Sequence, residues 1–304
     1  MNYKGCLYFV KMCGILACFS PNDDNCPSFH DRLLKLKARG PDETTIKRYV
    51  KPNLTTFTTG FVRNAISNVL NGSQPIETEN FVHLHNGEFY GEVELRKVLA
   101  DDLGYGLMWC HPVTSKNYLS MEESDSNLLK SMVSDSAMEF PKSLDGIFAY
   151  CSYDKQKETL YVARDRVGVI PLYYVKEKDS IALGTEEKSY ERIWFASEAK
   201  ALIGLGDIHV FMPNTIMSFK FDNLKIIERK ETILSPYKEV VEDERSYINH
   251  VKTLDPLLRT AVVKRNQYEV PWGVALSGGL DSNFVAFLKR QSEIDPYEPA
   301  EDSD

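Results

Sequence analysis

The sequence Met12-Cys13-Gly14-Ile15 opens an apolar strand and places a cysteine directly after a methionine. Removal of that methionine would make Cys13 the first residue of the mature chain. A thiol attacks best as thiolate, and a free α-amine with a pKa of about 8 can act as its base. Buried cysteines are also common in apolar strands, so Cys13 by itself predicts either a nucleophile or a core residue.

The composition, with 43% hydrophobic and 26% charged residues, is that of an ordinary soluble globular protein. A length of 304 residues predicts about two domains. The formal net charge of -8 offers no basic surface, so neither nucleic acid nor a membrane is expected as a partner. No run approaches the roughly 18 apolar residues of a membrane span. Six cysteines at irregular spacings, without a C-x-x-C pair, favour a reducing, cytoplasmic compartment.

Between Cys13 and about residue 231 the pattern is mostly strands with a few helices. Short apolar or alternating runs predict strands at residues 81–85, 146–153, 159–163, 172–175, 193–196 and 216–221. Helices are expected at residues 92–103 and 126–139, the second with Leu128, Leu129, Met132 and Val133 on one stripe. Strands and helices mixed in this way predict an α+β fold.

A different pattern follows the proline-containing, acidic stretch at residues 235–244, which is typical of a linker. Tyr247, Val251, Leu254, Leu258 and Ala261 recur at helical spacing, and residues 272–276 then predict a short apolar strand before a glycine turn. The expected organisation is a leader or upstream-start extension at 1–12, a first domain at 13–231, a linker at 232–244, a second domain at 245–292 and an acidic, disordered tail at 293–304.

Several short motifs occur in one fixed order along the first domain. They are Arg39-Gly40-Pro41-Asp42, the Arg63 strand with Gln74-Pro75, Asn86-Gly87-Glu88, Ser124-Asp125, Leu144-Asp145-Gly146-Ile147-Phe148-Ala149, Arg164-Asp165, Pro171-Leu172-Tyr173 and Ala196-Ser197-Glu198-Ala199-Lys200. This order resembles that of the N-terminal-nucleophile glutamine amidotransferases. The resemblance covers about residues 12–204 and implies a four-layer αββα domain that hydrolyses glutamine without a cofactor.

The resemblance also implies a role for each matched residue. Cys13 would be the nucleophile, and Asn86 with the Gly87 N–H would form the oxyanion hole. Arg63, Glu88 and Asp125 would bind glutamine, with Arg63 on the α-carboxylate and Asp125 on the α-ammonium. Taken alone, Asn86-Gly87 is more typical of a tight turn, Arg63 of surface charge and Ser124-Asp125 of a helix N-cap.

The sequence departs from the family at several positions. Ala38 stands where a histidine is common before R-G-P-D, and Asn127 where a glutamate often follows the binding aspartate. Eleven residues also precede Met12, and an amide nitrogen within a peptide bond is not basic. Translation from Met12, removal of a propeptide and loss of activity are the three explanations that remain.

His83 and His85 would lie on one face of a strand, where a metal site could form. No third ligand stands at a regular spacing, so a pair of strand-face histidines is expected and no metal is assigned.

The stretch from Gly273 to Ser282 is an apolar strand, a serine-glycine turn and the start of a helix. Glycines and a helix N-terminus together suit a phosphate group. The turn lacks the ending of a Walker loop but resembles S-G-G-x-D-S, the pyrophosphate loop of enzymes that cleave ATP to AMP. The resemblance implies ATP contacts from Leu276, Ser277, Gly278, Gly279, Asp281 and Ser282.

A glutaminase domain followed by this loop resembles the glutamine-hydrolysing asparagine synthetases. That family implies glutamine, aspartate and ATP as substrates, with ATP and Mg²⁺ needed for amidation of aspartate. Only 22 residues follow Ser282, so an incomplete α/β ATP-pyrophosphatase domain is expected, with a homodimer or a partner chain to supply the rest. The alternatives are a catalytically inactive or regulatory glutamine-binding module and the glutaminase domain of another amidotransferase of this class.

Overall fold

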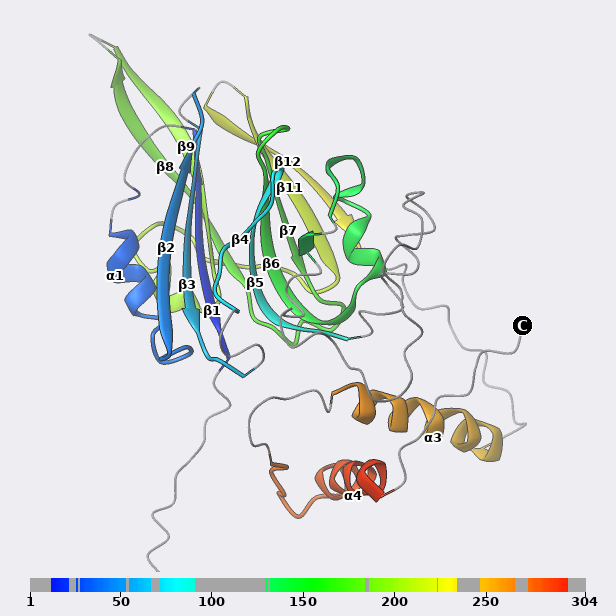
Figure 1. Cartoon of the computed structure of the whole chain (residues 1–304). Coiled ribbons are helices and arrows are strands. Elements are labelled where there is room, and N and C mark those ends of the chain that lie inside the picture. The colour runs from blue at the N-terminus through cyan, green and yellow to red at the C-terminus, as the bar shows by residue number, and fades with distance from the viewer. Residues whose placement is uncertain are drawn as a thin grey trace, which may run out of the picture. The chain divides into compact units, whose positions relative to one another are not determined.

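The structure, a computed structural model, describes most of residues 12–233 and two later segments. The described residues are 12–21, 26, 28–52, 55–66, 72–90, 129–130, 132–183, 186–222, 224–233, 247–265 and 273–294. The chain divides into two compact units, Met1–Ser235 and Pro236–Asp304. All of the described strands belong to the first unit, and the second contributes two helices (Figure 1).

Two six-stranded antiparallel sheets form the first unit and face each other (Figure 1). The first sheet has the order β10-β8-β9-β1-β3-β2 and the second has the order β12-β11-β7-β6-β5-β4. The strands of the first sheet are β1 (Gly14–Ser20), β2 (Glu43–Val50), β3 (Thr56–Arg63), β8 (Tyr173–Leu183), β9 (Glu186–Ala196) and β10 (His209–Val210). Those of the second are β4 (Ile76–Glu77), β5 (Phe81–Tyr90), β6 (Asp145–Asp154), β7 (Thr159–Arg164), β11 (Thr215–Asp222) and β12 (Lys225–Thr232).

The main hydrophobic core lies between the two sheets. On β1, Ile15, Ala17 and Phe19 belong to this core, whereas Leu16 and Cys18 belong to a second cluster on the other face. This alternation follows from the two-residue period of a strand. Residues an even number of positions apart on one strand therefore lie on the same face of the sheet. One core residue on a strand assigns the others to the inner or the outer face of the sandwich.

Helical segments cover the outer faces of the sandwich. Helix α1 (Phe29–Leu34) buries Phe29 and Leu33 in the outer cluster of the first sheet, with Phe29 stacked on Trp194 at 5.8 Å between ring centroids. On the outer face of the second sheet, Leu129 and Phe140 belong to a separate buried cluster. The predicted α+β fold with two central sheets is confirmed.

Most of the predicted strands are confirmed, and several are longer than the apolar run that predicted them. The run at residues 81–85 continues as β5 to Tyr90, so Asn86 and Gly87 lie inside a strand. The turn alternative for this dipeptide is therefore wrong. Strands β2 and β12 were not predicted, because most of their residues are exposed and polar and show no apolar alternation.

The helix predicted at residues 126–139 is wrong where the structure describes it. Residues 129–130, 134–136 and 140–143 form short 3-10 turns instead. Val133 is extended at φ -113° and ψ 147°, and the Ser-Asp-Ser sequence after it favours turns over helix. Leu129 and Met132 are nevertheless buried, as the predicted stripe required, whereas Val133 is 38% exposed. Leu128 and the helix predicted at residues 92–103 lie outside the described residues.

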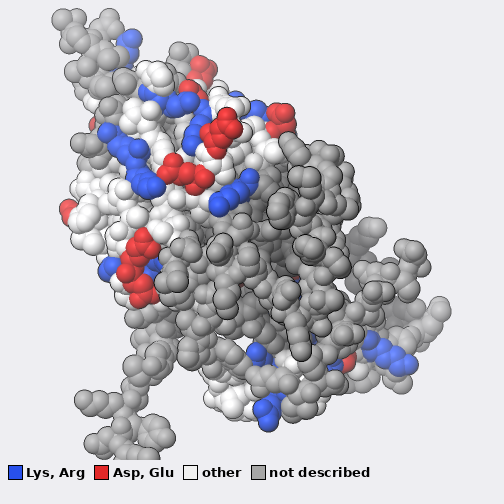
Figure 2. Space-filling model, viewed as in Figure 1, with Lys and Arg blue, Asp and Glu red and all other residues white. Residues whose placement is uncertain are grey.

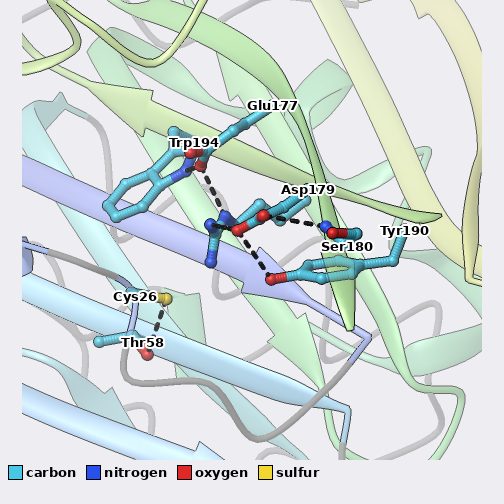
Figure 3. Close-up of polar contacts among 8 residues, drawn as sticks. Cys26, Thr58, Glu177, Asp179, Ser180, Tyr190 and Trp194 are labelled. Carbon is cyan, nitrogen blue, oxygen red and sulfur yellow. Dashed lines mark hydrogen bonds and ion pairs between the residues drawn. The ribbon is translucent and has the colours of Figure 1, made fainter. Parts of the chain in front are cut away.

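An ionic cluster around the buried Arg192 joins β8 and β9 on the outer side of the first sheet (Figure 3). Arg192, 1% exposed, donates from Nε to Glu177 at 2.6 Å and from a terminal nitrogen to Asp179 at 2.5 Å. Trp194 Nε1 also donates to Glu177, at 2.7 Å, and the Tyr190 hydroxyl donates to Asp179, at 3.2 Å. These directed bonds fix the register of the two strands, since a shift by one residue would leave the buried guanidinium unpaired.

The second unit contains α3 (Tyr247–Lys264) and α4 (Leu280–Ile294). The helix expected from the spacing of Tyr247 to Ala261 is confirmed. The strand expected at residues 272–276 is wrong for residues 273–276, which have no regular secondary structure, and residue 272 lies outside the described residues. A strand requires a backbone partner, and the described residues of this unit provide none. Residues 1–11 of the expected leader, 234–244 of the expected linker and 295–304 of the expected tail lie outside the described residues. The start of the expected linker is wrong, because Thr232 ends β12, and so is the start of the expected disordered tail, because residues 293–294 belong to α4.

The described surface carries no single dominant charge on the face shown in Figure 2. Lys and Arg side chains are interspersed there with Asp and Glu side chains. None of the helices in the described part of the chain combines the length and the hydropathy that a membrane span requires.

Candidate active site

Cys13 immediately precedes β1 and is half-buried. Its thiol lies against Asn64, whose backbone N–H donates to Sγ at 3.4 Å and whose carbonyl oxygen is 3.6 Å from Sγ. The carbonyl oxygen of Cys13 accepts a hydrogen bond from Arg39 Nε at 2.9 Å. The thiol therefore donates to one backbone group of Asn64 and accepts from the other, so this residue fixes the orientation of the Cys13 side chain.

The R-G-P-D motif at residues 39–42 holds the end of β3 in place. Gly40 lies so close to this strand that a Cβ atom there would be 2.3 Å from the carbonyl oxygen of Val62. Asp42 donates its N–H to the Arg63 carbonyl at 3.0 Å and accepts from the Ala65 N–H at 2.8 Å. The motif therefore positions the segment that surrounds the Cys13 thiol.

Arg63 ends β3 on the inner face of the first sheet. Arg63 lies an even number of positions after Phe57 and Phe61 on the same strand, so it faces the inter-sheet core as they do, and it is 6% exposed. Because Gly14 pairs with Val62, Arg63 is next to the position of Cys13. The surface-charge alternative for Arg63 is wrong, since the guanidinium is buried and directed between the sheets.

Asn86 and Glu88 lie on the inner face of the second sheet. They lie an even number of positions after Val82 and Leu84, whose side chains belong to the inter-sheet core, and therefore face the same way. Asn86 is 2% exposed and Glu88 is half-buried. Between them, Gly87 has φ +128°, and a Cβ atom there would be 1.9 Å from the carbonyl oxygen of Ile147. Only glycine fits this position.

Ser197 joins the two sheets at this end of the sandwich. Its hydroxyl oxygen accepts from the Ile15 N–H at 2.9 Å and from Asn86 Nδ2 at 3.5 Å. Its own N–H donates to the Ile15 carbonyl at 3.0 Å. The sequence pattern contained Ser197 within a motif but assigned it no role, because its contacts are with residues far away in the chain.

A network of charges lies beside the Cys13 backbone. Arg39 forms an ion pair with Glu198 at 3.2 Å, and Lys200 forms another with the same carboxylate at 2.6 Å. Burial raises the pKa of Glu198, but the hydrogen bonds from Lys200 and Arg39 outweigh this effect and hold the pKa below its usual value. The carboxylate therefore stays ionised and fixes the guanidinium that contacts the Cys13 carbonyl.

Four of the predicted site residues of the first unit thus lie on the facing surfaces of the two sheets. Cys13 and Arg63 come from the first sheet and Asn86 and Glu88 from the second. Asp125 lies outside the described residues. The arrangement brings a thiol, a buried cation and a carboxamide N–H to one end of the space between the sheets.

His83 and His85 share one face of β5, as expected, and that face is the outer one. His83 is fully buried and its Nδ1 is 2.8 Å from the Ser152 hydroxyl oxygen. The ring of His85 stacks on that of Phe89, with 4.2 Å between the ring centroids. Burial, with a smaller effect from Lys155, lowers the pKa of His83 to about 3. Among the described residues, no group of three possible ligands could hold a metal ion.

The Arg164-Asp165 motif organises a loop rather than the site. Arg164 donates to the carbonyl oxygens of Ile170 and Phe211 at 2.6 Å and of Gly168 at 2.7 Å. Asp165 accepts from the backbone N–H groups of residues 167 to 170 at 2.6–3.1 Å. These bonds account for the motif without a catalytic role.

The serine-glycine turn of the second unit leads directly into α4. The hydroxyls of Ser277 and Ser282 are 3.0 Å apart, and the Ser282 hydroxyl donates to the Gly279 carbonyl at 3.1 Å. Gly278 has φ +81° with no atom within 4 Å of a Cβ position, and Leu276 is 62% exposed. Asp281 lies in the first turn of the helix. The turn is preorganised by its own serines and is open to an approaching ligand.

The two facing sheets, with the motif residues gathered at one end of the space between them, are the features expected of a glutamine amidotransferase domain. The family model described as glutamine amidotransferase domain matches residues 12–254, and the chain belongs to this family. A second model, described as asparagine synthase, matches residues 253–297. The resemblance expected from the motifs is thereby confirmed.

Similar curated proteins are glutamine-hydrolysing asparagine synthetases from several organisms. Asparagine synthetase [glutamine-hydrolyzing] 1 of Saccharomyces cerevisiae is 30% identical over 94% of this chain and 46% of its own length. The probable asparagine synthetase of Dictyostelium discoideum is 30% identical over 91% of this chain and 45% of its own length. The nodule asparagine synthetase of Pisum sativum is 31% identical over 90% of this chain and 42% of its own length. The chain spans less than half the length of these curated relatives.

Solved structures support the fold. The allosteric regulatory enzyme of purine biosynthesis matches 74% of this chain and 50% of its own chain with a TM-score of 0.50 and 15% identity. At this identity the likeness shows the fold alone.

Proposed function

We propose that this chain hydrolyses glutamine to glutamate and ammonia, with Cys13 as the nucleophile. The observation that carries the proposal is the meeting of Cys13 and Arg63 with Asn86 between the two sheets, in a chain that belongs to the glutamine amidotransferase family. The thiol is half-buried beside a backbone N–H, whereas Cys18, the next cysteine along the strand, is fully buried on the other face.

The proposed reaction begins when the Cys13 sulfur attacks the side-chain carbonyl carbon of glutamine and its proton passes to the α-amine of the same residue. The oxyanion accepts hydrogen bonds from Asn86 Nδ2 and from the Gly87 N–H. Collapse of the tetrahedral intermediate breaks the C–N bond, and the amine returns the proton to the leaving ammonia. Water then attacks the thioester, giving glutamate and restoring the thiol.

Substrate binding is assigned to charged residues at the same end of the sandwich. Arg63 would hold the α-carboxylate and Glu88 and Asp125 would hold the α-ammonium end of glutamine. The low exposure of Arg63 strengthens such a contact, because a charge pair shielded from water is less screened.

This mechanism requires Cys13 to be the N-terminal residue, since only a free α-amine can accept the thiol proton. Mass spectrometry of the mature protein tests the requirement. A chain that retains Met1 in every molecule would contradict the mechanism.

We further propose that the ammonia serves an ATP-dependent amidation of aspartate, since the curated relatives are named glutamine-hydrolysing asparagine synthetases. The turn from Leu276 to Ser282 would contact the phosphates of ATP through Ser277, Gly278, Gly279, Asp281 and Ser282. Mg²⁺ would accompany ATP, and the glutaminase step would need neither.

The experiment uses purified protein whose N-terminus is confirmed as Cys13. It is incubated with glutamine, aspartate, ATP and Mg²⁺, and glutamate, AMP and asparagine are measured separately. Glutamate release that is abolished in Cys13→Ala and retained in Cys18→Ala supports the glutaminase. Activity of Cys13→Ala within tenfold of the parent would contradict it, because loss of a nucleophile costs many powers of ten. AMP and asparagine, measured apart, test the second proposal independently.

A further inference from the structure

Ser197 contacts the strand that carries the proposed nucleophile. It follows β9 directly, is fully buried and bonds to Ile15 in both directions, as donor through its N–H and as acceptor through its hydroxyl oxygen. Ile15 is two residues after Cys13 on β1. The serine side chain thus extends the pairing of β9 with β1 beyond its last backbone pair and fixes the strand next to the thiol.

The same hydroxyl oxygen contacts the proposed oxyanion donor from the other sheet. Asn86 Nδ2 donates to it at 3.5 Å. A hydroxyl oxygen has two lone pairs, so it can accept from Ile15 and Asn86 together. One buried atom therefore links the backbone beside Cys13 with the carboxamide of Asn86 across the inter-sheet space.

We propose that Ser197 is a positioning residue that orients the Asn86 carboxamide relative to Cys13 during glutamine hydrolysis, an inference that rests on the proposed function. The carboxamide carries two N–H groups. A bond from one of them to Ser197 restricts rotation about the terminal torsion and directs the other toward the oxyanion. At 3.5 Å the contact is long, and catalytic hydrogen bonds of this kind often shorten along the reaction path.

The test is a double-mutant cycle on the processed protein, with kcat and KM for glutamate release measured in each member. Ser197→Ala is expected to lower kcat by about tenfold to a hundredfold and to change KM by less than about threefold, because a displaced donor affects mainly the transition state. In the Asn86→Ala background the same change should lower kcat no further, since the group that Ser197 orients is already absent.

Two controls separate positioning from folding. Ser152→Ala removes another fully buried hydroxyl, bonded to His83 on the outer face, and should leave kcat unchanged. Thr and Val side chains have nearly the same shape, but only Thr carries a hydroxyl. The kcat of Ser197→Thr should therefore be at least tenfold higher than that of Ser197→Val, even if Ser197→Ala destabilises the domain.

Two outcomes would overturn the inference alone: kcat of Ser197→Ala within twofold of an active parent, or an equal loss of kcat in both backgrounds. A processed parent that releases no glutamate would overturn the proposed function together with the inference.

Discussion

Glu43 and Arg63 lie directly opposite each other on β2 and β3, with 3.7 Å between a Glu43 carboxylate oxygen and an Arg63 guanidinium nitrogen. The other oxygen of Glu43 accepts a hydrogen bond from the Ser73 hydroxyl at 2.5 Å. The protein thus supplies a fixed counter-charge on one side of the cation that is proposed to bind the substrate carboxylate. Removing Arg63 therefore affects both glutamine binding and the neighbouring carboxylate.

A paired variant separates these two effects of Arg63. Arg63→Met is expected to raise the glutamine KM by about 30-fold to 1,000-fold, corresponding to about 2 to 4 kcal/mol, because a substrate charge is left without its partner. It should also lower the free energy of unfolding, since Glu43 loses its counter-charge.

The control is Arg63→Met combined with Glu43→Gln. The amide keeps the shape of Glu43 and an acceptor for Ser73, so urea unfolding should show recovered stability without recovered KM. A double variant that binds glutamine within threefold of the parent would show that Arg63 is structural only.

Asn86→Ala should separate the transition state from the ground state. The oxyanion forms only along the reaction path, so kcat should fall by about 100-fold or more while KM changes little. Steady-state kinetics on the processed protein measures both. A higher KM with an unchanged kcat would mean that Asn86 holds the substrate and does not stabilise the oxyanion.

Gly87→Ala should distort the strand that carries this donor. The added Cβ would meet the Ile147 carbonyl oxygen at 1.9 Å in a backbone conformation that other residues rarely adopt. We expect a loss of about 2 to 5 kcal/mol in the free energy of unfolding together with a loss of glutaminase activity.

Gly204 provides a matched control for Gly87. It has φ +88° and no atom within 4 Å of a Cβ position, so Gly204→Ala incurs only the backbone strain. Its expected cost is about 1 kcal/mol, with activity retained. Equal effects of the two substitutions on urea unfolding would mean that the contact with Ile147 is relieved by a small shift.

Predictions from sequence succeeded where a local pattern has one structural solution. The alternation around Phe81 to His85 predicted a strand, and β5 is that strand. Its continuation through Asn86 and Gly87 depends on pairing with β6, a partner some sixty residues away, whereas the dipeptide itself is locally turn-like. The apolar spacing of Leu129 and Met132 correctly indicated burial but not helix, because separate turns packed on a sheet can bury the same positions.

The candidate site was predictable only in part for the same reason. Short motifs identified Cys13, Arg63 and Asn86 through a family resemblance. The link through Ser197 joins residues 111 and 182 positions apart, and it arises only when the two sheets meet. No pattern within a single strand encodes such a contact.

His83 should make stability depend on pH although it lies on the outer face, away from the proposed site. Its folded-state pKa is lowered to about 3 by burial and, to a lesser extent, by Lys155, from an ordinary value near 6.5. The unfolded chain therefore binds a proton more readily than the folded one. The contribution of His83 to stability is complete above about pH 6.5 and is lost progressively as the pH falls from there toward 3.

Between pH 7.5 and pH 5.0 this linkage predicts a decrease of about 2 kcal/mol in the free energy of unfolding from His83 alone. The measurement is urea unfolding at both pH values for the parent and for His83→Phe combined with Ser152→Ala, which also removes the hydroxyl that would lose its partner. Because the two proteins differ in no other ionisable side chain, the difference between the two pH dependences isolates His83. The variant should lose about 2 kcal/mol less than the parent on acidification, and equal losses would mean that His83 gains access to water or a counter-charge before the domain unfolds.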